Sequence, residues 1–287
     1  FQSLFGGDII ASFQDPAIAP IGTLFEQSQN DSEKYGTRLT YALQQVRLTP
    51  IDNPQQKVLN WDVTIEGGKT ELTFLDQHKN HTMLVSAEPG ETGIRIAASG
   101  EVETNDTAGV LGKVYGTAPL WHFQQHTRRT EPGKGTSRLA KMIGKTDSLL
   151  DDLHALSKAV LEAVPYGQGD TFVGTTAEEA LIAGGGVCQD HAQIFVTAAR
   201  KAGVPARYVS GYLMMNDRVD QDASHAWAEA HLDGLGWVGF DVSNGISPDE
   251  RYVRLATGLD SRDAAPISGM RMGAANESMI VSLQIQQ

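Results

Sequence analysis

Residues 184–192 read GGGVCQDHA and contain Cys188, the only cysteine of the chain. The glycines let the backbone turn sharply just before the cysteine. The apolar residues that follow recur at helical spacing and predict a helix over 189–202; they are Ala192, Phe195, Val196 and Ala199. Cys188 is therefore expected at a helix N-terminus, where unpaired N–H groups and the helix dipole favour a thiolate over a thiol. A nucleophilic cysteine needs this property, and the same N–H groups can bind a developing oxyanion.

Two strand-like runs offer partners for this cysteine. Residues 224–230 (SHAWAEA) alternate, with His225, Trp227 and Glu229 on one face and alanines on the other. A turn then leads into a second run, WVGFD, which ends at Asp241. In such a hairpin, His225 and Asp241 can lie side by side. A lone cysteine is more often an inert packing residue. The chain order Cys, His, Asp is instead that of a nucleophile, its base and the carboxylate that orients the base.

Three neighbours of Cys188 on the predicted helix are further candidates. The side chain of Gln189 is a possible second oxyanion donor beside the backbone N–H of Cys188. Asp190 lies in the first helical turn, where a carboxylate complements the dipole, so capping is its simplest role. His191 follows Cys188 by three residues and lies close to it on the helix. A supporting role is preferred for His191, because His225 is the histidine followed by an aspartate in a strand context.

Two aromatic residues complete the set of candidates. Tyr166 lies in a loop, 165–170, which is either a plain turn or a wall of the cleft. Trp227 is expected in the core, or as a shield between the site and water. We therefore treat both as candidate supporting or substrate-binding residues.

Three segments together resemble the transglutaminase-like superfamily, specifically its bacterial cysteine-protease-like branch. They are 184–213 (GGGVCQDHAQIFVTAARKAGVPARYVSGYL), 224–232 (SHAWAEAHL) and 236–245 (GWVGFDVSNG). Upstream, LQQVRLTP, VLNWDVTIEGG and GEVETNDTAGV resemble the β domain that precedes this catalytic domain in bacteria. The resemblance implies that Cys188, His225 and Asp241 form a catalytic triad without a cofactor. The upstream tryptophan known from eukaryotic transglutaminases has no counterpart between Trp121 and Cys188.

The expected fold class is α+β. An N-terminal β-sandwich-like domain would precede a papain/transglutaminase-like catalytic domain, in which the cysteine-bearing helix packs on an antiparallel sheet. Five strand-like runs between 37 and 104 favour the first part. The apolar spacing over 147–164 predicts a helix that Thr146 or Asp147 can cap. The expected boundaries are an N-terminal segment of unclear role at 1–36, a β domain at 37–108, a connector at 109–140, a catalytic domain at 141–260 and a tail at 261–287 with a closing strand at 279–285.

Composition restricts the partners and the location. The formal net charge is −12 at pH 7, which argues against nucleic acid or an anionic membrane surface as the main partner. A single cysteine cannot form an internal disulfide, which suits a cytoplasmic protein. No apolar run approaches the roughly 20 residues of a transmembrane helix. No metal site is predicted, because the histidines lack zinc-type spacing; the four considered are His78, His81, His122 and His126.

The expected chemistry is attack of a cysteine thiolate on an amide carbonyl to give an acyl-enzyme. Our interpretation is a cysteine peptidase or amidase that acts on a peptide or protein. Transfer of the acyl group from a protein glutamine to an amine, as in a transglutaminase, is the alternative reaction. A non-catalytic peptide-binding scaffold is the alternative from another class, although the complete triad weighs against it. A phosphate-binding glycine loop is excluded, because no Gly-Lys-Ser/Thr follows GGG.

Overall fold

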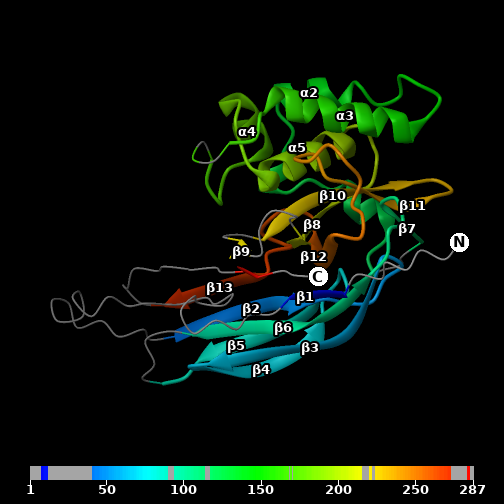
Figure 1. The fold of residues 1–287 in the computed structure, drawn as a ribbon. Coiled ribbons are helices and arrows are strands. Elements are labelled where there is room, and N and C mark those ends of the chain that lie inside the picture. Colours follow the sequence, from blue (N-terminus) through cyan, green and yellow to red (C-terminus); the bar gives the residue numbers. More distant parts are fainter. Residues whose placement is uncertain are drawn as a thin grey trace, which may run out of the picture.

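The computed structural model describes residues 8–11, 41–89, 94–113, 117–167, 169, 171–214, 220–221, 224–272 and 283–284. The fold is α+β, as the sequence predicts. Figure 1 shows three tiers: helices on one side, a central sheet, and the N-terminal strands on the other side. The central tier is a five-stranded antiparallel sheet in the order β12-β8-β10-β11-β7. Its strands are β7 (Val110–Gly112), β8 (Ala206–Leu213), β10 (His225–Leu232), β11 (Gly236–Phe240) and β12 (Tyr252–Gly258).

The helical tier is built around one buried helix, α5 (Cys188–Lys201). Every residue of α5 from Asp190 to Arg200 is buried. The alanines of β10 face this helix and pack with it, because a small side chain at every second position lets a helix approach the sheet closely. The surrounding helices are α2 (Lys134–Ala140), α3 (Leu149–Ala163), α4 (Ala177–Ala183) and the 3₁₀ turns η1 (Leu120–Gln124) and η2 (Arg128–Thr130).

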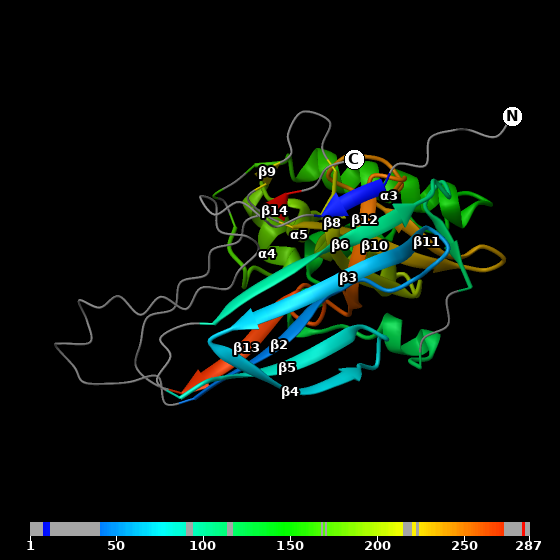
Figure 2. The ribbon, with the colours of Figure 1, turned by 60° about the horizontal axis from the view of Figure 1, so that its bottom comes forward.

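The N-terminal strands and β13, which comes from near the end of the chain, form two sheets that share one apolar core; both are called the N-terminal sheets below. Their orders are β1-β6-β3 and β13-β2-β5-β4, and Figure 2 shows both from the side opposite the helices. Val46 from the second sheet and Ile96 from the first belong to the same buried cluster, which agrees with the sandwich-like prediction. The strands are β1 (Asp8–Ala11), β2 (Tyr41–Thr49), β3 (Gln56–Glu66), β4 (Gly68–Leu75), β5 (His81–Ala87), β6 (Arg95–Thr104) and β13 (Ile267–Met272).

The N-terminal sheets are joined to the central sheet along β12, its edge strand. The side-chain amide of Gln56 donates to the carbonyl of Arg254 at 2.9 Å and accepts from its N–H at 2.7 Å. Asn80 makes the same pair of bonds with Thr257, at 2.8 and 2.9 Å. Apolar residues of the central sheet, Val253 among them, belong to the N-terminal core. The edge of β12 is therefore closed by side-chain amides instead of another strand.

Several local expectations change in the structure. The helix expected over 147–164 is α3, and its N-cap is Ser148, which accepts a hydrogen bond from Asp151 N–H at 3.2 Å; Thr146 and Asp147 do not cap it. The strands β7, β9 (Asp220–Gln221), β12 and β13 have no counterpart in the sequence-based prediction. Of the strand expected over 279–285, the described part is β14 (Leu283–Gln284), which pairs with β9 (Asp220–Gln221); 279–282 and 285 lie outside the described residues. Of 1–36, only β1 is described. The predicted domain boundaries stay predictions.

None of the helices in the described part of the chain has the length and apolar character needed to span a membrane.

Candidate active site

Cys188 is the first residue of α5 and is half-buried. The chain reaches it through a tight connection, because α4 ends at Gly184, which has the left-handed φ of 73° that glycine adopts readily. At Gly186, a Cβ atom would lie 2.9 Å from a carboxylate oxygen of Asp190, so only glycine fits without a shift. The glycines of the quoted motif thus position the cysteine at the start of the helix.

Asp190 holds this connection in place. Its Oδ2 accepts the N–H of Val187 at 2.9 Å and the hydroxyl of Thr171 at 2.6 Å, and its side chain is fully buried. The carboxylate thereby caps the first turn of α5, as the sequence predicts, and also ties a second loop to that turn.

His225 is the first residue of β10, and its side chain lies between Cys188 and Asp241. Its Nε2 is 2.6 Å from Asp241 Oδ2, and it also forms a hydrogen bond with Cys188, for which the remaining ring nitrogen, Nδ1, is available. Burial lowers the pKa of His225, but the hydrogen bonds and the negative charges of Asp241 and Cys188 outweigh it and raise the pKa to about 10. The imidazolium form is therefore favoured at neutral pH.

Asp241 follows β11 directly and is completely buried. Besides His225, its Oδ2 accepts the side-chain amide of Asn244 and the hydroxyl of Tyr252, each at 2.7 Å. Burial raises the pKa of Asp241, yet the bonds and charge of His225, and then Asn244 and Tyr252, lower it overall. The carboxylate is thus held ionised in a buried position by three side-chain donors.

Trp227 packs beside the histidine. The rings of Trp227 and His225 are stacked, with centroids 6.2 Å apart and an interplanar angle of 27°. Trp227 also meets Tyr252 edge-on at 5.5 Å. Gly211, opposite His225 on β8, makes room for this indole, because a Cβ there would lie 2.6 Å from the indole ring. Trp227 is 2% exposed and so covers one face of the imidazole against water.

Two hydrogen bonds fix the ring of His191. Its Nε2 donates to the carbonyl of Val164 at 2.6 Å, and its Nδ1 accepts the hydroxyl of Ser243 at 2.8 Å. Burial lowers the pKa of His191, which favours the neutral tautomer that these two bonds require. Both ring nitrogens are therefore occupied in holding α5 to its neighbours.

Tyr166 and Gln189 lie at the rim of the site. Tyr166 is 55% exposed and pairs with Gly186 through a short parallel bridge. Burial, followed by the negative charges of Cys188 and Asp241, raises the pKa of the Tyr166 phenol. The Gln189 amide is 3.5 Å from the carbonyl of Val173 and so faces a neighbouring loop.

The sequence-based analysis missed three residues that touch this group. Asn244 and Tyr252 hold Asp241, and Tyr208 belongs to the buried cluster against which Cys188 packs. Asn244 has a weak signal, since an Asn three residues after an Asp at a strand end is typical of a turn. Tyr252 and Tyr208 have none, because the approach of Tyr252 depends on the pairing of β12 with β8 and that of Tyr208 depends on the packing of α5 against β8.

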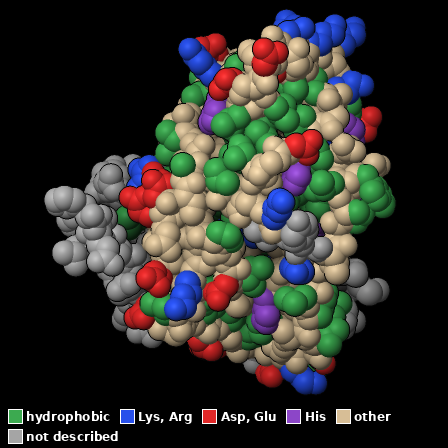
Figure 3. All heavy atoms as spheres, turned by 90° about the vertical axis from the view of Figure 1, so that its right-hand side faces the viewer, with side chains coloured by type: hydrophobic (Ala, Val, Ile, Leu, Met, Phe, Trp, Pro, Cys, Tyr) green, Lys and Arg blue, Asp and Glu red, His purple; other side chains and the backbone are tan. Residues whose placement is uncertain are grey.

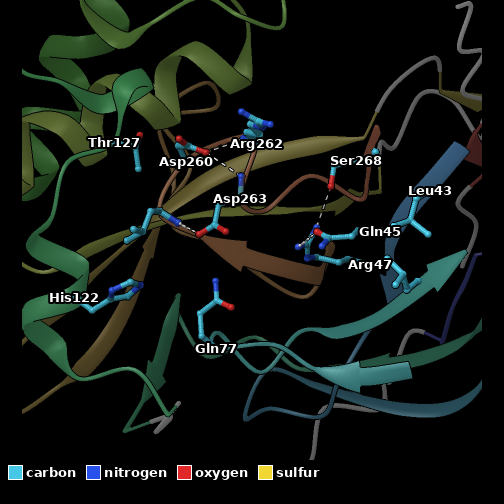
Figure 4. A pocket seen from close by; sticks show the side chains of 13 residues that line it. Leu43, Gln45, Arg47, Gln77, His122, Thr127, Asp260, Arg262, Asp263 and Ser268 are labelled. Atoms are coloured by element: carbon cyan, nitrogen blue, oxygen red, sulfur yellow. Dashed lines mark hydrogen bonds between the residues drawn. The ribbon is translucent and has the colours of Figure 1, made fainter. Parts of the chain in front are cut away.

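A cavity with polar and charged lining residues lies elsewhere in the molecule. Its volume is about 570 Å³, and Figure 4 shows it between the N-terminal strands and the loop that follows β12. Its charged side chains are largely paired, because Arg47 is 3.2 Å from Asp76 and Asp263 is 2.7 Å from His78. None of the predicted site residues lines this cavity, so it has no part in the chemistry considered below.

Charge is mixed on the face of the molecule shown in Figure 3, where acidic and basic side chains are interspersed. A nucleic-acid-binding face instead gathers Lys and Arg into a patch or stripe. This face therefore gives no support to a nucleic-acid partner.

Comparison with protein families gives two matches in the expected order. Residues 137–242 match the transglutaminase-like superfamily, and residues 34–103 match the bacterial transglutaminase-like N-terminal region. The first match includes Cys188, His225 and Asp241.

Individual relatives agree with these matches. Uncharacterized protein ML0607 of Mycobacterium leprae is 26% identical over 264 residues, 88% of this chain and 94% of that protein. Uncharacterized protein Rv2569c of Mycobacterium tuberculosis is 33% identical over 142 residues, 46% of this chain and 45% of that protein. The crystal structure of a candidate cysteine protease from Cytophaga hutchinsonii superposes with a TM-score of 0.65 at 20% identity and covers 87% of this chain and 94% of that one. At this identity the likeness establishes the fold.

Proposed function

This chain belongs to the transglutaminase-like superfamily, and from that premise we propose that it is a cysteine-nucleophile amide hydrolase, a peptidase or amidase acting on a peptide or protein. The observation that carries the proposal is the position of His225. It is 2.6 Å from Asp241 on one ring nitrogen and is hydrogen-bonded to Cys188 as well. A nucleophile, a base and an orienting carboxylate linked in this way are the groups that amide cleavage through an acyl-enzyme needs.

The reaction would begin from the thiolate and imidazolium pair. Cys188 Sγ attacks the carbonyl carbon, and the C–N bond breaks while His225 gives its proton to the leaving amine. Water then attacks the thioester carbon and loses a proton to His225. The C–S bond breaks, which releases the acid and restores the pair. Asp241 keeps the imidazole oriented and stabilises its charge throughout.

Charge that develops on the carbonyl oxygen needs a donor. The backbone N–H of Cys188 has no acceptor among the described residues, as expected for the first residue of a helix. We therefore propose this N–H as an oxyanion donor, where one such donor contributes roughly 100-fold to 1,000-fold to the turnover rate.

Hydrolysis and acyl transfer differ only in the second nucleophile, which is water or an amine. Acyl transfer from a protein glutamine is thus the second candidate, since it would use the same acyl-enzyme. A peptide-binding scaffold is the third, and it requires neither an activated thiol nor turnover.

One experiment separates the three. Wild-type protein and a Cys188→Ala variant are incubated with a peptide library that includes glutamine peptides, with and without hydroxylamine, and the products are identified by mass. The proposal predicts new peptide ends or deamidated side chains in water, and neither of them with Cys188→Ala. Modification of glutamine side chains only when hydroxylamine is present, with neither chain cleavage nor deamidation in water, would support the acyltransferase instead. If neither product forms while Cys188→Ala binds peptides as well as wild type does, the scaffold is favoured.

The cytoplasmic location and the lack of nucleic-acid and membrane partners stay predictions from composition.

A further inference from the structure

We infer that Phe172 and Val173 form an apolar subsite beside Cys188, so that the substrate is a peptide with a large apolar side chain within two residues of the amide that is attacked. This inference deepens the proposed function and rests on it, because the bound peptide is a substrate only if the protein cleaves it. The binding of such a peptide can be measured without turnover.

Phe172 and Val173 are exposed to an unusual degree for large apolar residues. Phe172 is 74% exposed and Val173 is 70% exposed, and Tyr166 on the neighbouring loop is 55% exposed. Water contact of apolar surface costs about 25 cal/mol per Å², so covering these side chains with a ligand would be favourable. Adjacent exposed apolar side chains of this size are typical of a binding surface.

The loop that carries the two side chains is held in a defined conformation. The N–H of Phe172 donates to Thr175 Oγ1 at 3.0 Å, and the N–H of Thr175 donates back to the carbonyl of Phe172 at 2.9 Å. The phenyl ring lies over Gly174, where a Cβ would be 2.8 Å from it. The ring is thus positioned outward by its own loop, which lowers the ordering cost of binding.

The same loop is fastened to the residues on both sides of Cys188. Asp190 Oδ2 accepts the Thr171 hydroxyl at 2.6 Å and the N–H of Val187, the residue before Cys188, at 2.9 Å. The amide of Gln189, the residue after Cys188, is 3.5 Å from the carbonyl of Val173. A chain whose carbonyl carbon is at Cys188 Sγ therefore passes close to Phe172 and Val173.

No charged side chain occurs among the described residues of this loop, which are 165–167, 169 and 171–176. Asp190 is completely buried and faces inward to Thr171 and Val187, so it is not offered to a ligand. The large exposed side chains among these described residues are those of Phe172, Val173 and Tyr166. Leu, Met and Phe side chains fit such a surface best, whereas Asp, Glu and Gly do not.

Binding to the inactive variant tests this inference. Labelled peptides that differ only in having Leu, Phe, Gly or Asp at the two positions on each side of one amide are titrated against Cys188→Ala and followed by fluorescence anisotropy. We expect the Leu and Phe peptides to bind at least about tenfold more tightly than the Gly and Asp peptides. Adding Phe172→Ser and Val173→Ser should abolish that preference.

A control uses another pair of exposed apolar residues, Leu72 and Phe74 on β4, which are 54% and 37% exposed and lie in the N-terminal sheets. Leu72→Ser with Phe74→Ser should leave the preference intact. Circular dichroism confirms that both double variants fold. The inference is overturned if the preference is missing or survives in the Phe172 and Val173 variant. It is also overturned if the wild type dimerises through this loop, seen as a dimer in sedimentation that the variant lacks. Absence of turnover with intact apolar preference would contradict only the proposed function.

Discussion

His225 is the residue through which the parts of the site act on each other. It contacts Asp241 at 2.6 Å, bonds to Cys188 and stacks on Trp227. Its imidazolium form is stabilised by two negative groups, although burial opposes any charge. The charge on His225 is therefore the property that its neighbours control.

Replacing Asp241 by Asn should lower the pKa of His225 from about 10, because burial then opposes the charge with Cys188 as the remaining anionic partner. A histidine NMR titration measures this directly. His231 on the same strand serves as the internal control, since burial and Asp233 set its pKa and Asp241 does not. We expect the turnover rate to fall by roughly 100-fold to 10,000-fold. A His225 titration that is unchanged in Asp241→Asn would contradict the proposed link.

Tyr252→Phe removes one of the donors to Asp241 and nothing else from the site. The buried carboxylate would lose a 2.7 Å hydrogen bond, so the free energy of unfolding should fall by about 1–3 kcal/mol. Urea denaturation measures the change. Tyr166→Phe, at an exposed tyrosine, should change it by less than about 0.5 kcal/mol. Equal effects of the two substitutions would mean that the bond to Asp241 contributes no stability.

At this scale the sequence predicts the residues with a chemical signature. A lone cysteine after glycines, an alternating strand and a strand that ends at an aspartate are recognisable patterns. They single out Cys188, His225 and Asp241, which lie together in the structure. Tyr252 could not be found in this way, because a tyrosine in an apolar run is typical of a core. Its role depends on which strand lies next to β8.

Among the elements, three strands of the central sheet are joined by a buried charge cluster. Glu229 on β10 accepts from Arg207 on β8 and, at 3.1 Å, from Arg254 on β12, and its side chain is fully buried. Arg207 also stacks its guanidinium over Trp237, 3.9 Å from the ring centroid. The sheet that positions His225 therefore depends on one carboxylate.

Glu229→Gln should destabilise the protein by about 3–5 kcal/mol, because two buried guanidinium groups would lose their only carboxylate partner in the described part of the chain. Chemical denaturation is the measurement. Lys158→Ala, which breaks an exposed pair with Glu162 on α3, should cost less than about 1 kcal/mol. If Glu229→Gln lowers the free energy of unfolding by less than about 1 kcal/mol, the charge cluster does not stabilise the sheet.

Helix limits show where local signals suffice. The spacing of Thr175 with Glu178 and of Thr176 with Glu179 predicts a capping box at either threonine. In α4 the box is formed by Thr176 and Glu179, with bonds of 3.3 and 2.9 Å. At α3, three consecutive residues are possible caps. Ser148 is the cap that forms, because Asp152 accepts the N–H groups of the loop before it and keeps that loop outside the helix. The three donors are Gly144, Lys145 and Thr146. A propensity rule does not include such a contact.

At the scale of the whole molecule, the side-chain amides of Gln56 and Asn80 connect the N-terminal sheets to β12 of the central sheet. Both amides are 2% exposed. Gln56→Ala combined with Asn80→Ala would leave four buried backbone groups of β12 without partners. We expect a loss of roughly 4–12 kcal/mol if all four groups stay buried, or the appearance of two thermal transitions if the parts separate.

Calorimetry distinguishes these outcomes from no effect. Asn60→Ala is the control, because this exposed amide bonds only to the side chain of Glu101. A single transition with wild-type stability in the double variant would contradict a structural role for the bridges.

The long-range arrangement could not be predicted from local patterns. β13 pairs with β2, residue for residue from Ile267↔Val46 to Met272↔Tyr41, across most of the chain. Nothing near 267–272 signals that partner, and the return of the chain to the N-terminal sheet follows from tertiary packing. The resemblance to a family supplied the fold class, whereas the joint between its two parts came from the structure.

The most direct test of the account is the rate of Cys188 alkylation by iodoacetamide as a function of pH, in wild type and in His225→Ala, followed by intact mass. Because the chain has a single cysteine, each carbamidomethyl group added to a thiol reports on Cys188. If His225 activates Cys188, we expect the wild type to react well below about pH 7 and the variant to react only near about pH 8.5, as a free thiol does. If the two proteins react alike and slowly, Cys188 and His225 do not form an activated pair, and a peptide-binding scaffold becomes the better description.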